Sequence, residues 1–359
     1  MSLVNTRIQN IRAKSNLDKF EFRPSRYGAL NAFMVQSESP TGILTDEIKA
    51  KARTSIGNIL ETPVFNYDAG VTIGNERTLT IADSENTSKM IQITFATLSW
   101  GFTIAPAMYM NNEIGIQKDF ETKMMKYIYK VAEKMDEMAL ATLAANKTQI
   151  LKNKLLYNFA AGQVSGKWTE RENIWTDLEV MQAANDFYGQ LHIVGDPGVE
   201  SIMKKIAQKG LYNSVNKQNE FGNKIVHLTN HLASAEGKFA QGYAINEDSL
   251  GLLLRFERDC LLGTISGDGH EWGISTLPLL NMPVGTYFYD SVGDYSGIAG
   301  EATADMKRTR KEHYGFAVDV AFITSYNSDP ATLPSPILGF DISSENAVYA
   351  EPVYNVNTQ

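Results

Sequence analysis

The chain has 359 residues, of which 43% are hydrophobic and 21% charged, and this composition indicates a well-filled core rather than a disordered protein. Its net charge of -8 excludes a generally basic surface for nucleic acid. The single cysteine excludes an intrachain disulfide. No apolar run is long enough to cross a membrane, so no membrane partner is expected.

The N-terminal region is predicted to be an arm. Residues 1 to 44 are polar and interrupted by proline and glycine, so they are predicted to be irregular. Residues 1 to 30 carry a net charge of +4, which leaves -12 on the remainder. Its candidates for facing a nucleic acid are Arg7, Arg12 and Lys14. The alternative is a solvated or packed terminal arm. A short helix is predicted over Asp46 to Leu60, ending before Pro63.

A pleated stretch from Val64 to Ile104 predicts a two-stranded arm. Ile91, Ile93 and Phe95 alternate with polar residues, and a weaker alternating set begins at Val71 and Ile73. A lone hairpin is marginally stable in water, so this one needs a surface to cover. The side chains predicted to form an assembly interface are Val71, Ile73, Ile91, Ile93, Phe95 and Trp100. The alternative is a hairpin folded onto its own subunit.

One long amphipathic helix is predicted over Asn112 to Lys147. Apolar side chains recur there at spacings of three and four and form a single stripe. The stripe predicted to pack this helix comprises Ile116, Phe120, Met124, Ile128, Val131 and Met135. At about 1.5 Å per residue the helix is about 50 Å long, too long to lie wholly inside a compact domain. The alternative is a helix that crosses the back of an ordinary α+β domain.

The rest of the chain predicts short helices and strands in separate blocks. A helix opens near Thr176 and ends by Gly189, and a strand, a turn and a helix follow from Leu191 to Gly210. Further strands are predicted at Phe221 to Val226, Gly242 to Ile245, Gly251 to Phe256 and Glu312 to Tyr326. Residues 261 to 311 are glycine-rich and are predicted to form a surface excursion. The fold class is α+β.

No catalytic residue, metal ligand or cofactor is assigned. His227 and His231 are four residues apart, but the glutamate of a zinc protease motif is missing between them and the context predicts a strand. No phosphate-binding or dinucleotide-binding glycine motif follows a strand. An unrecognised α+β enzyme remains the alternative to an assembly protein.

This order of elements resembles the major capsid proteins of tailed bacteriophages, which have the Hong Kong 97 fold. The resemblance implies an N-terminal arm with a short helix (1–60), an extended β-hairpin loop (61–111), and a spine helix with part of a peripheral domain (112–175). It further implies an axial domain that includes the glycine-rich excursion (176–311). The return strand of the peripheral domain and a C-terminal tail then complete the chain (312–359).

The resemblance also implies a function. Such a protein would self-assemble through pentameric and hexameric rings into an icosahedral shell enclosing double-stranded DNA, which it contacts non-specifically. It would have scaffold, portal and decoration proteins as partners, no enzymatic activity and no cofactor. It would be located in the virion capsid after assembly in the host cytoplasm. The alternative is an encapsulin-like nanocompartment shell with protein cargo, and the basic N-terminal region weakly favours DNA.

Overall fold

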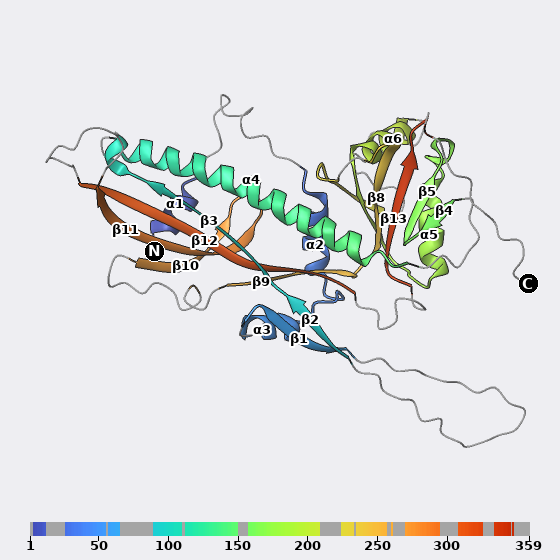
Figure 1. Cartoon of the computed structure of the whole chain (residues 1–359), viewed down its shortest axis with the longest axis horizontal. Coiled ribbons are helices and arrows are strands. Elements are labelled where there is room, and N and C mark those ends of the chain that lie inside the picture. The colour runs from blue at the N-terminus through green and yellow to red at the C-terminus, as the bar shows by residue number, and fades with distance from the viewer. Residues whose placement is uncertain are drawn as a thin grey trace, which may run out of the picture.

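The computed structural model describes residues 3–11, 26–54, 57–64, 89–109, 112–149, 157–208, 224–232, 235–256, 260, 270–294, 308–325, 334–345 and 347. These residues form a long unit, in which helix α4 runs along a five-stranded sheet, and a second unit built on a six-stranded sheet (Figure 1). A small two-stranded sheet, β1 and β2, projects from the long unit. The α+β fold class is confirmed.

The long unit packs α4 (Glu113–Asn146) against an antiparallel sheet. Its strands are β3 (Ala96–Ile104), β9 (Leu250–Arg255), β10 (His270–Leu277), β11 (Met282–Asp294) and β12 (Arg308–Thr324). The strand order is β10-β11-β12-β3, and β9 also pairs with β12. Alternate strand residues such as Phe316 and Val318 face the helix and share one core with Phe120 and Met124. Helix α1 (Leu3–Gln9) adds Val4 and Ile8 to that core.

The predicted long helix is confirmed with slightly narrower bounds. It has 34 residues and begins after Asn112, whose side-chain oxygen accepts a hydrogen bond of 3.0 Å from the amide of Ile114. The one-turn helix η1 (Pro106–Tyr109) leads into it. The structure buries the whole predicted stripe: Ile116, Phe120, Met124, Ile128, Val131 and Met135.

The second unit is a mixed sheet with helices on both faces. Its strand order is β4-β5-β13-β8-β6-β7. The strands are β4 (Asn158–Ala160), β5 (Gln163–Gly166), β6 (Leu191–Gly195), β7 (Lys224–Leu228), β8 (Lys238–Asn246) and β13 (Ile337–Ser343). Helices α5 (Ile174–Ala184) and α6 (Pro197–Gln208) pack on one face of this sheet. The short helix η2 (Trp168–Glu170) precedes α5 in the chain. The predicted strand, turn and helix that begin at Leu191 are confirmed as β6 and α6, and the predicted helix end at Gly210 lies outside the described residues.

Helix α2 (Gly28–Ser37) joins the two units. Ala29, Ala32 and Phe33 are fully buried between the C-terminal part of α4 and the other face of the six-stranded sheet. Gly28 allows the approach, because a Cβ there would lie 2.5 Å from the carbonyl carbon of Leu228. The prediction that residues 1 to 44 are irregular is therefore wrong for α1 and α2. Both are helices whose apolar side chains are buried in the body.

Helix α3 (Asp46–Thr54) precedes the small two-stranded sheet. The predicted helix over Asp46 to Leu60 is too long, because Gly57 takes a φ of +83° and Ile59 already begins β1 (Ile59–Val64). Strand β1 pairs antiparallel with β2 (Lys89–Thr94). The predicted strand positions Val71 and Ile73 lie outside the described residues.

The prediction that residues 261 to 311 form a surface excursion is wrong for the described residues 270–294. Residues 270–294 form the hairpin of β10 and β11 inside the five-stranded sheet, and β9 joins the same sheet through β12. An axial domain running from 176 to 311 would require these strands to belong to the six-stranded sheet. They belong to the five-stranded sheet instead, so these bounds are corrected. Gly285 permits close packing, because a Cβ there would lie 3.0 Å from Cys260 Sγ. The glycines of this region concealed the strands β10 and β11 from sequence reasoning.

Candidate assembly interface

The arm formed by β1 and β2 is anchored at its base by a small apolar core. Leu60 is 3% exposed and Ile93 is 9% exposed. They pack with Leu253 of β9 and Ala321 of β12, on the face of the five-stranded sheet that points away from α4. Helix α3 contributes Ala52 to the same cluster. The base of the arm is thus part of the folded subunit.

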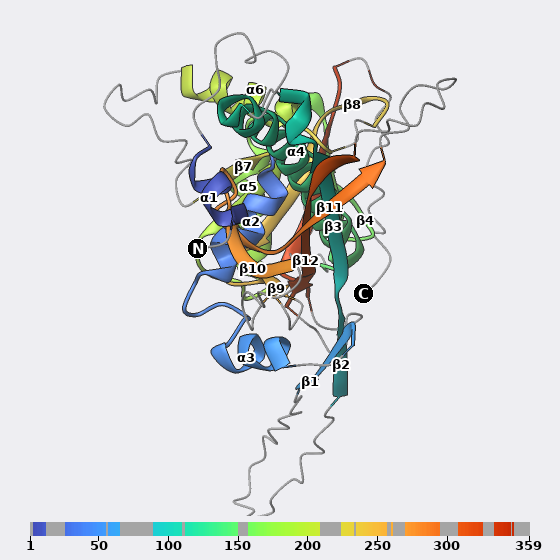
Figure 2. The same cartoon turned by 90° about the vertical axis from the view of Figure 1, so that its left-hand side faces the viewer.

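Burial falls along the inner face of the arm away from this base, and the outer face is exposed throughout its described apolar positions. On the inner face, Ile93 is buried, Ile91 is half-buried and Lys89 is exposed. On the outer face, Ile59 is 48% exposed and Met90 is 53% exposed. Figure 2 shows β1 and β2 extending beyond the body next to α3. Among the described strands, β1 and β2 pair only with each other, so the outer part of this hairpin has too little cover for independent stability.

The predicted interface residues divide into three groups. Ile93 and Phe95 are buried by their own chain, because the arm base lies on its own sheet, so their assignment to a contact between subunits is corrected. Ile91 and Trp100 are half-buried, and Trp100 stacks on Phe316 of β12 with ring centroids 5.6 Å apart. Val71 and Ile73 lie outside the described residues. Among the described positions, Ile91 is therefore the best candidate for a contact with a neighbouring subunit, because it lies on the arm and its own chain covers it only in part.

Arg7 does not face a nucleic acid in this fold. It is 6% exposed, and its Nη2 lies 3.1 Å from Oε2 of Glu312 on β12. The same carboxylate oxygen accepts a hydrogen bond of 2.6 Å from the hydroxyl of Tyr314, and burial, together with that bond, raises the pKa of Tyr314. A buried guanidinium requires a carboxylate partner, and Glu312 is that partner for Arg7. The prediction that Arg7 contacts a nucleic acid is therefore corrected. Arg12 and Lys14 lie outside the described residues.

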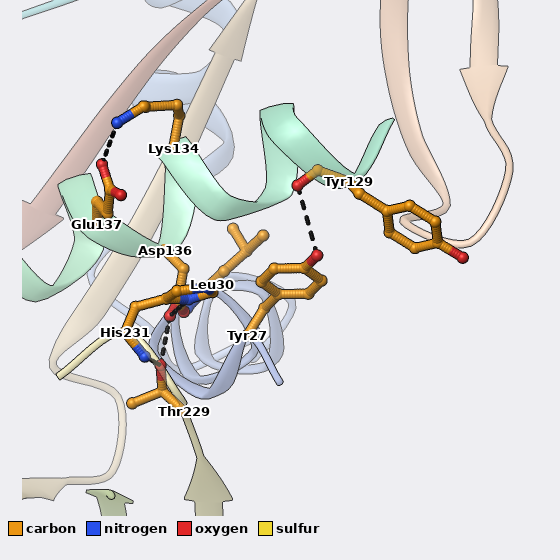
Figure 3. Close-up of polar contacts among 8 residues, drawn as sticks. All are labelled: Tyr27, Leu30, Tyr129, Lys134, Asp136, Glu137, Thr229 and His231. Atoms are coloured by element: carbon orange, nitrogen blue, oxygen red, sulfur yellow. Dashed lines mark hydrogen bonds and ion pairs between the residues drawn. The ribbon is translucent and has the colours of Figure 1, made fainter. Parts of the chain in front are cut away.

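A buried carboxylate on α4 holds the two units together (Figure 3). Asp136 has no exposed surface. It accepts hydrogen bonds from the amide of Leu30 at 2.8 Å and from the hydroxyl of Thr229 at 2.5 Å, and it lies 2.9 Å from His231 Nδ1. The bond to Leu30 caps helix α2 from outside, because Tyr27 at the N-cap position provides no side-chain acceptor.

Sequence reasoning missed this junction. Asp136 directly follows Met135 and precedes Glu137, so it looks like one more charged residue beside the apolar stripe. Its partners come from α2 and from the segment after β7, roughly 90 to 110 residues away along the chain. The local signal for a buried polar contact was the position of this carboxylate, which lies among small and apolar residues of α4.

Two histidines form a second buried polar contact between β6 and β7. His227 Nε2 lies 3.0 Å from His192 Nδ1, and the two rings are stacked. Asn31 of α2 lies 3.3 Å from His227 Nδ1. Burial, reinforced by the neighbouring His192, lowers the pKa of His227 to about 4, and burial also lowers the pKa of His192. Both rings are therefore neutral at pH 7.

His227 and His231 do not form a metal site. His227 contacts His192, whereas His231 contacts Asp136. Within the described ranges, no group of three or more histidine, cysteine, aspartate or glutamate side chains is arranged to hold a metal ion. No helix of the described part, α4 included, is long and apolar enough to cross a membrane.

The neutral His227 predicts an acid-sensitive fold. In the unfolded chain a histidine takes up its proton near pH 6.5, but the folded protein holds His227 neutral down to about pH 4. The unfolded state thus binds more protons between these values, and the free energy of unfolding falls as the pH falls, by about 2 to 3 kcal/mol at pH 4.5. Denaturant titrations at pH 7 and pH 4.5 measure this loss.

The variant His227→Gln serves as the comparison, because it removes the titrating ring while carboxylates elsewhere still titrate. Its stability is expected to depend less on pH by about that same amount. An identical pH dependence in both proteins would show that His227 does not contribute.

Comparisons with known proteins give only structural likenesses. A scan against models of known protein families and a search of the curated proteins both find no match. Among solved structures, the capsid of Ralstonia phage GP4 is similar with a TM-score of 0.48 and 10% identity, over 95% of this chain and 97% of that one. Mycobacterium phage Bobi matches with a TM-score of 0.47 and 8% identity, over 96% and 100%. The asymmetric unit of the mature capsid of bacteriophage PhiM1 matches with a TM-score of 0.43 and 10% identity, over 85% and 90%.

Proposed function

We propose that this chain is a major capsid protein that self-assembles into an icosahedral shell. The observation that carries the proposal is the loss of burial along the inner face of the arm, from the buried Ile93 through the half-buried Ile91 to the exposed Lys89. A two-stranded sheet that leaves its own body in this way needs another surface to lie on. A second copy of the chain is the partner that a shell provides.

The contact is heterologous, because the arm of one subunit meets a different surface of the next. Such contacts close into rings when the rotation between subunits fits, and rings of five and six tile an icosahedral shell. Individual arm contacts need not be strong. Many such contacts hold the shell together, because every subunit is linked to several neighbours at once.

The long unit supplies the stiff part of such a subunit. Helix α4 packs along the sheet of β3 and β12, and residues at both of its ends are buried, from Ile116 to Leu143. The carboxylate of Asp136 then ties α4 to α2 and to the second unit. A rigid body with a projecting arm fixes the angle between neighbouring subunits. A closed shell of defined size requires such fixed angles.

The shell is proposed to enclose double-stranded DNA, bound without sequence preference. The N-terminal basic residues Arg12 and Lys14 are its candidate contacts, and Arg7 is withdrawn because Glu312 already pairs with it. Scaffold, portal and decoration proteins are the further proposed partners. The proposed location is the virion capsid, after assembly in the host cytoplasm, and the role requires no cofactor.

Electron microscopy of the purified, expressed chain tests the proposal. Closed particles tens of nanometres across are expected, together with elution near the void volume in size-exclusion chromatography. A stable monomer or dimer at high protein concentration would contradict the assignment. Nuclease-protected double-stranded DNA inside particles isolated from producing cells is expected, and particles that hold protein cargo instead would support a nanocompartment.

A further inference from the structure

Arg255, the last residue of β9, lies at the point where the arm meets the body. It is 8% exposed. On the body side, its Nε and Nη2 lie 3.0 Å and 2.8 Å from Oδ2 of Asp319 on β12. The other carboxylate oxygen of Asp319 accepts a hydrogen bond of 2.6 Å from the hydroxyl of Thr97 on β3. Asp319 is thus held at the position where β12 pairs with both β3 and β9.

The same guanidinium contacts both ends of the arm. Its Nη1 donates to the carbonyl oxygen of Gly57 and its Nη2 lies 3.4 Å from Oδ1 of Asn58, where the chain enters β1. Its central carbon lies 4.5 Å from the ring centroid of Phe95, where the chain leaves β2. The amide of Phe95 donates to the carbonyl oxygen of Asn58 at 2.8 Å, which closes the base.

Without these contacts the base has a natural pivot. Gly57 has a φ of +83°, is exposed, and would have no atom within 4 Å of an added Cβ. Glycine at such a position has wide backbone freedom. The carbonyl of this residue is one of the groups that Arg255 holds. The guanidinium therefore restrains a backbone position at which the arm can swing without steric cost.

We propose that Arg255 is a positioning residue that sets the angle between the arm and the body, and through it the curvature at which neighbouring subunits join. The second half of this inference rests on the proposed capsid function. A planar guanidinium has five donors in a fixed fork, so it can contact Asp319, Gly57 and Asn58 together. A lysine ammonium at the end of a flexible stem cannot hold all three.

The experiment measures the arm angle directly in unassembled subunits. Spin labels are placed at Met90→Cys on the arm and Lys130→Cys on α4, which are 53% and 73% exposed, in a Cys260→Ala background. Pulsed electron resonance then gives the distribution of distances between the labels. The test variants are Arg255→Lys and Asp319→Asn, which weaken the same contact from its two sides. Asp319→Asn keeps the proposal testable if Arg255→Lys folds poorly. The matched control is Arg310→Lys, which changes an exposed arginine paired with Asp290 at 2.6 Å on the same sheet.

A single narrow distance peak is expected for the parent and for the Arg310→Lys control. Loss of that peak to a broad distribution is expected for Arg255→Lys and Asp319→Asn. A narrow, unshifted peak in both test variants would overturn the proposal, and so would a broad peak in the parent. Electron microscopy of the same variants without labels is expected to show irregular or open particles.

The two halves of the inference fail separately. If the parent forms no particles but the test variants still lose the narrow peak, the capsid function is wrong and the role of Arg255 in fixing the arm stands. If the peak is lost but particles keep the parent's size and shape, the arm angle does not set curvature and that half is overturned.

Discussion

Replacing Met124 and Ile128 together with aspartate is expected to abolish folding of the chain. Both side chains lie on the buried face of α4, at 0% and 1% exposure, and pack in the core with Phe316 and Val318. Two carboxylates there would have no charged or hydrogen-bonding partner, and each costs several kcal/mol to bury or to neutralise. Their sum is comparable to the whole stability of a protein, about 5 to 15 kcal/mol. Circular dichroism should show no cooperative thermal transition.

The matched control places the same two aspartates on the other side of the same helix, as Lys126→Asp and Lys130→Asp. Both lysines are exposed and four residues apart, as Met124 and Ile128 are. The lost surface charge pairs are expected to cost less than about 1 kcal/mol each. A parent-like transition in the Met124 and Ile128 variant would mean that this stripe does not form the core.

Shortening the arm is expected to abolish assembly but not folding. Val64 and Lys89 are directly opposite each other at the outer end of β1 and β2. Residues 65–88 can therefore be replaced by Asn-Gly, the dipeptide that favours a tight hairpin turn. The apolar base around Leu60, Ile93 and Leu253 remains, so the midpoint of thermal unfolding is expected to stay unchanged. Electron microscopy should show no closed particles.

The deletion has to stop before β3. That strand pairs with β12 from Ala96 opposite Val320 to Ile104 opposite Glu312, so removing it would damage the sheet itself. As a control, Leu279→Asn alters another surface hairpin, at a residue 68% exposed with a φ of +72°, and should assemble normally. Normal particles from the shortened chain would show that the arm does not join subunits. A large drop in its unfolding midpoint would show that the removed residues stabilise their own subunit.

The sequence predicts best those elements whose signals are local. Helix α4 follows from the spacing of its apolar residues, and the start of α6 follows from Asp196 and Pro197. Asp196 indeed accepts a hydrogen bond of 3.0 Å from the amide of Val199 at that helix start. Helix α2 was missed because Gly28, Leu30, Phe33 and Gln36 are buried around much of its circumference, which leaves no polar face to reveal the helical period.

Long-range choices could not be predicted in the same way. The strand over Gly251 to Phe256 was predicted, whereas the glycines of residues 261 to 311 hid β10 and β11. Pairing with β12, which is distant in the chain, places β9 and β11 in the five-stranded sheet. The same limit applies to the candidate interface. The alternation of Ile91, Ile93 and Phe95 identifies an apolar face, but not whether its own subunit or a neighbour covers it. The structure divides that face, with Ile93 and Phe95 buried internally and Ile91 half-buried.

The core around α2 has a consequence for synthesis of the protein. That core brings together Ala29 and Phe33 near the start of the chain, Leu143 in the middle, and Ile337 near the end. A ribosome must release almost the whole polypeptide before these side chains can meet, and contacts so distant in sequence form slowly. Phe33 and its neighbours therefore stay incompletely covered on the nascent chain, and exposed apolar side chains favour aggregation with other unfinished chains. We infer that the supply of molecular chaperones, which bind unfolded chains, limits the yield of folded subunits before assembly begins.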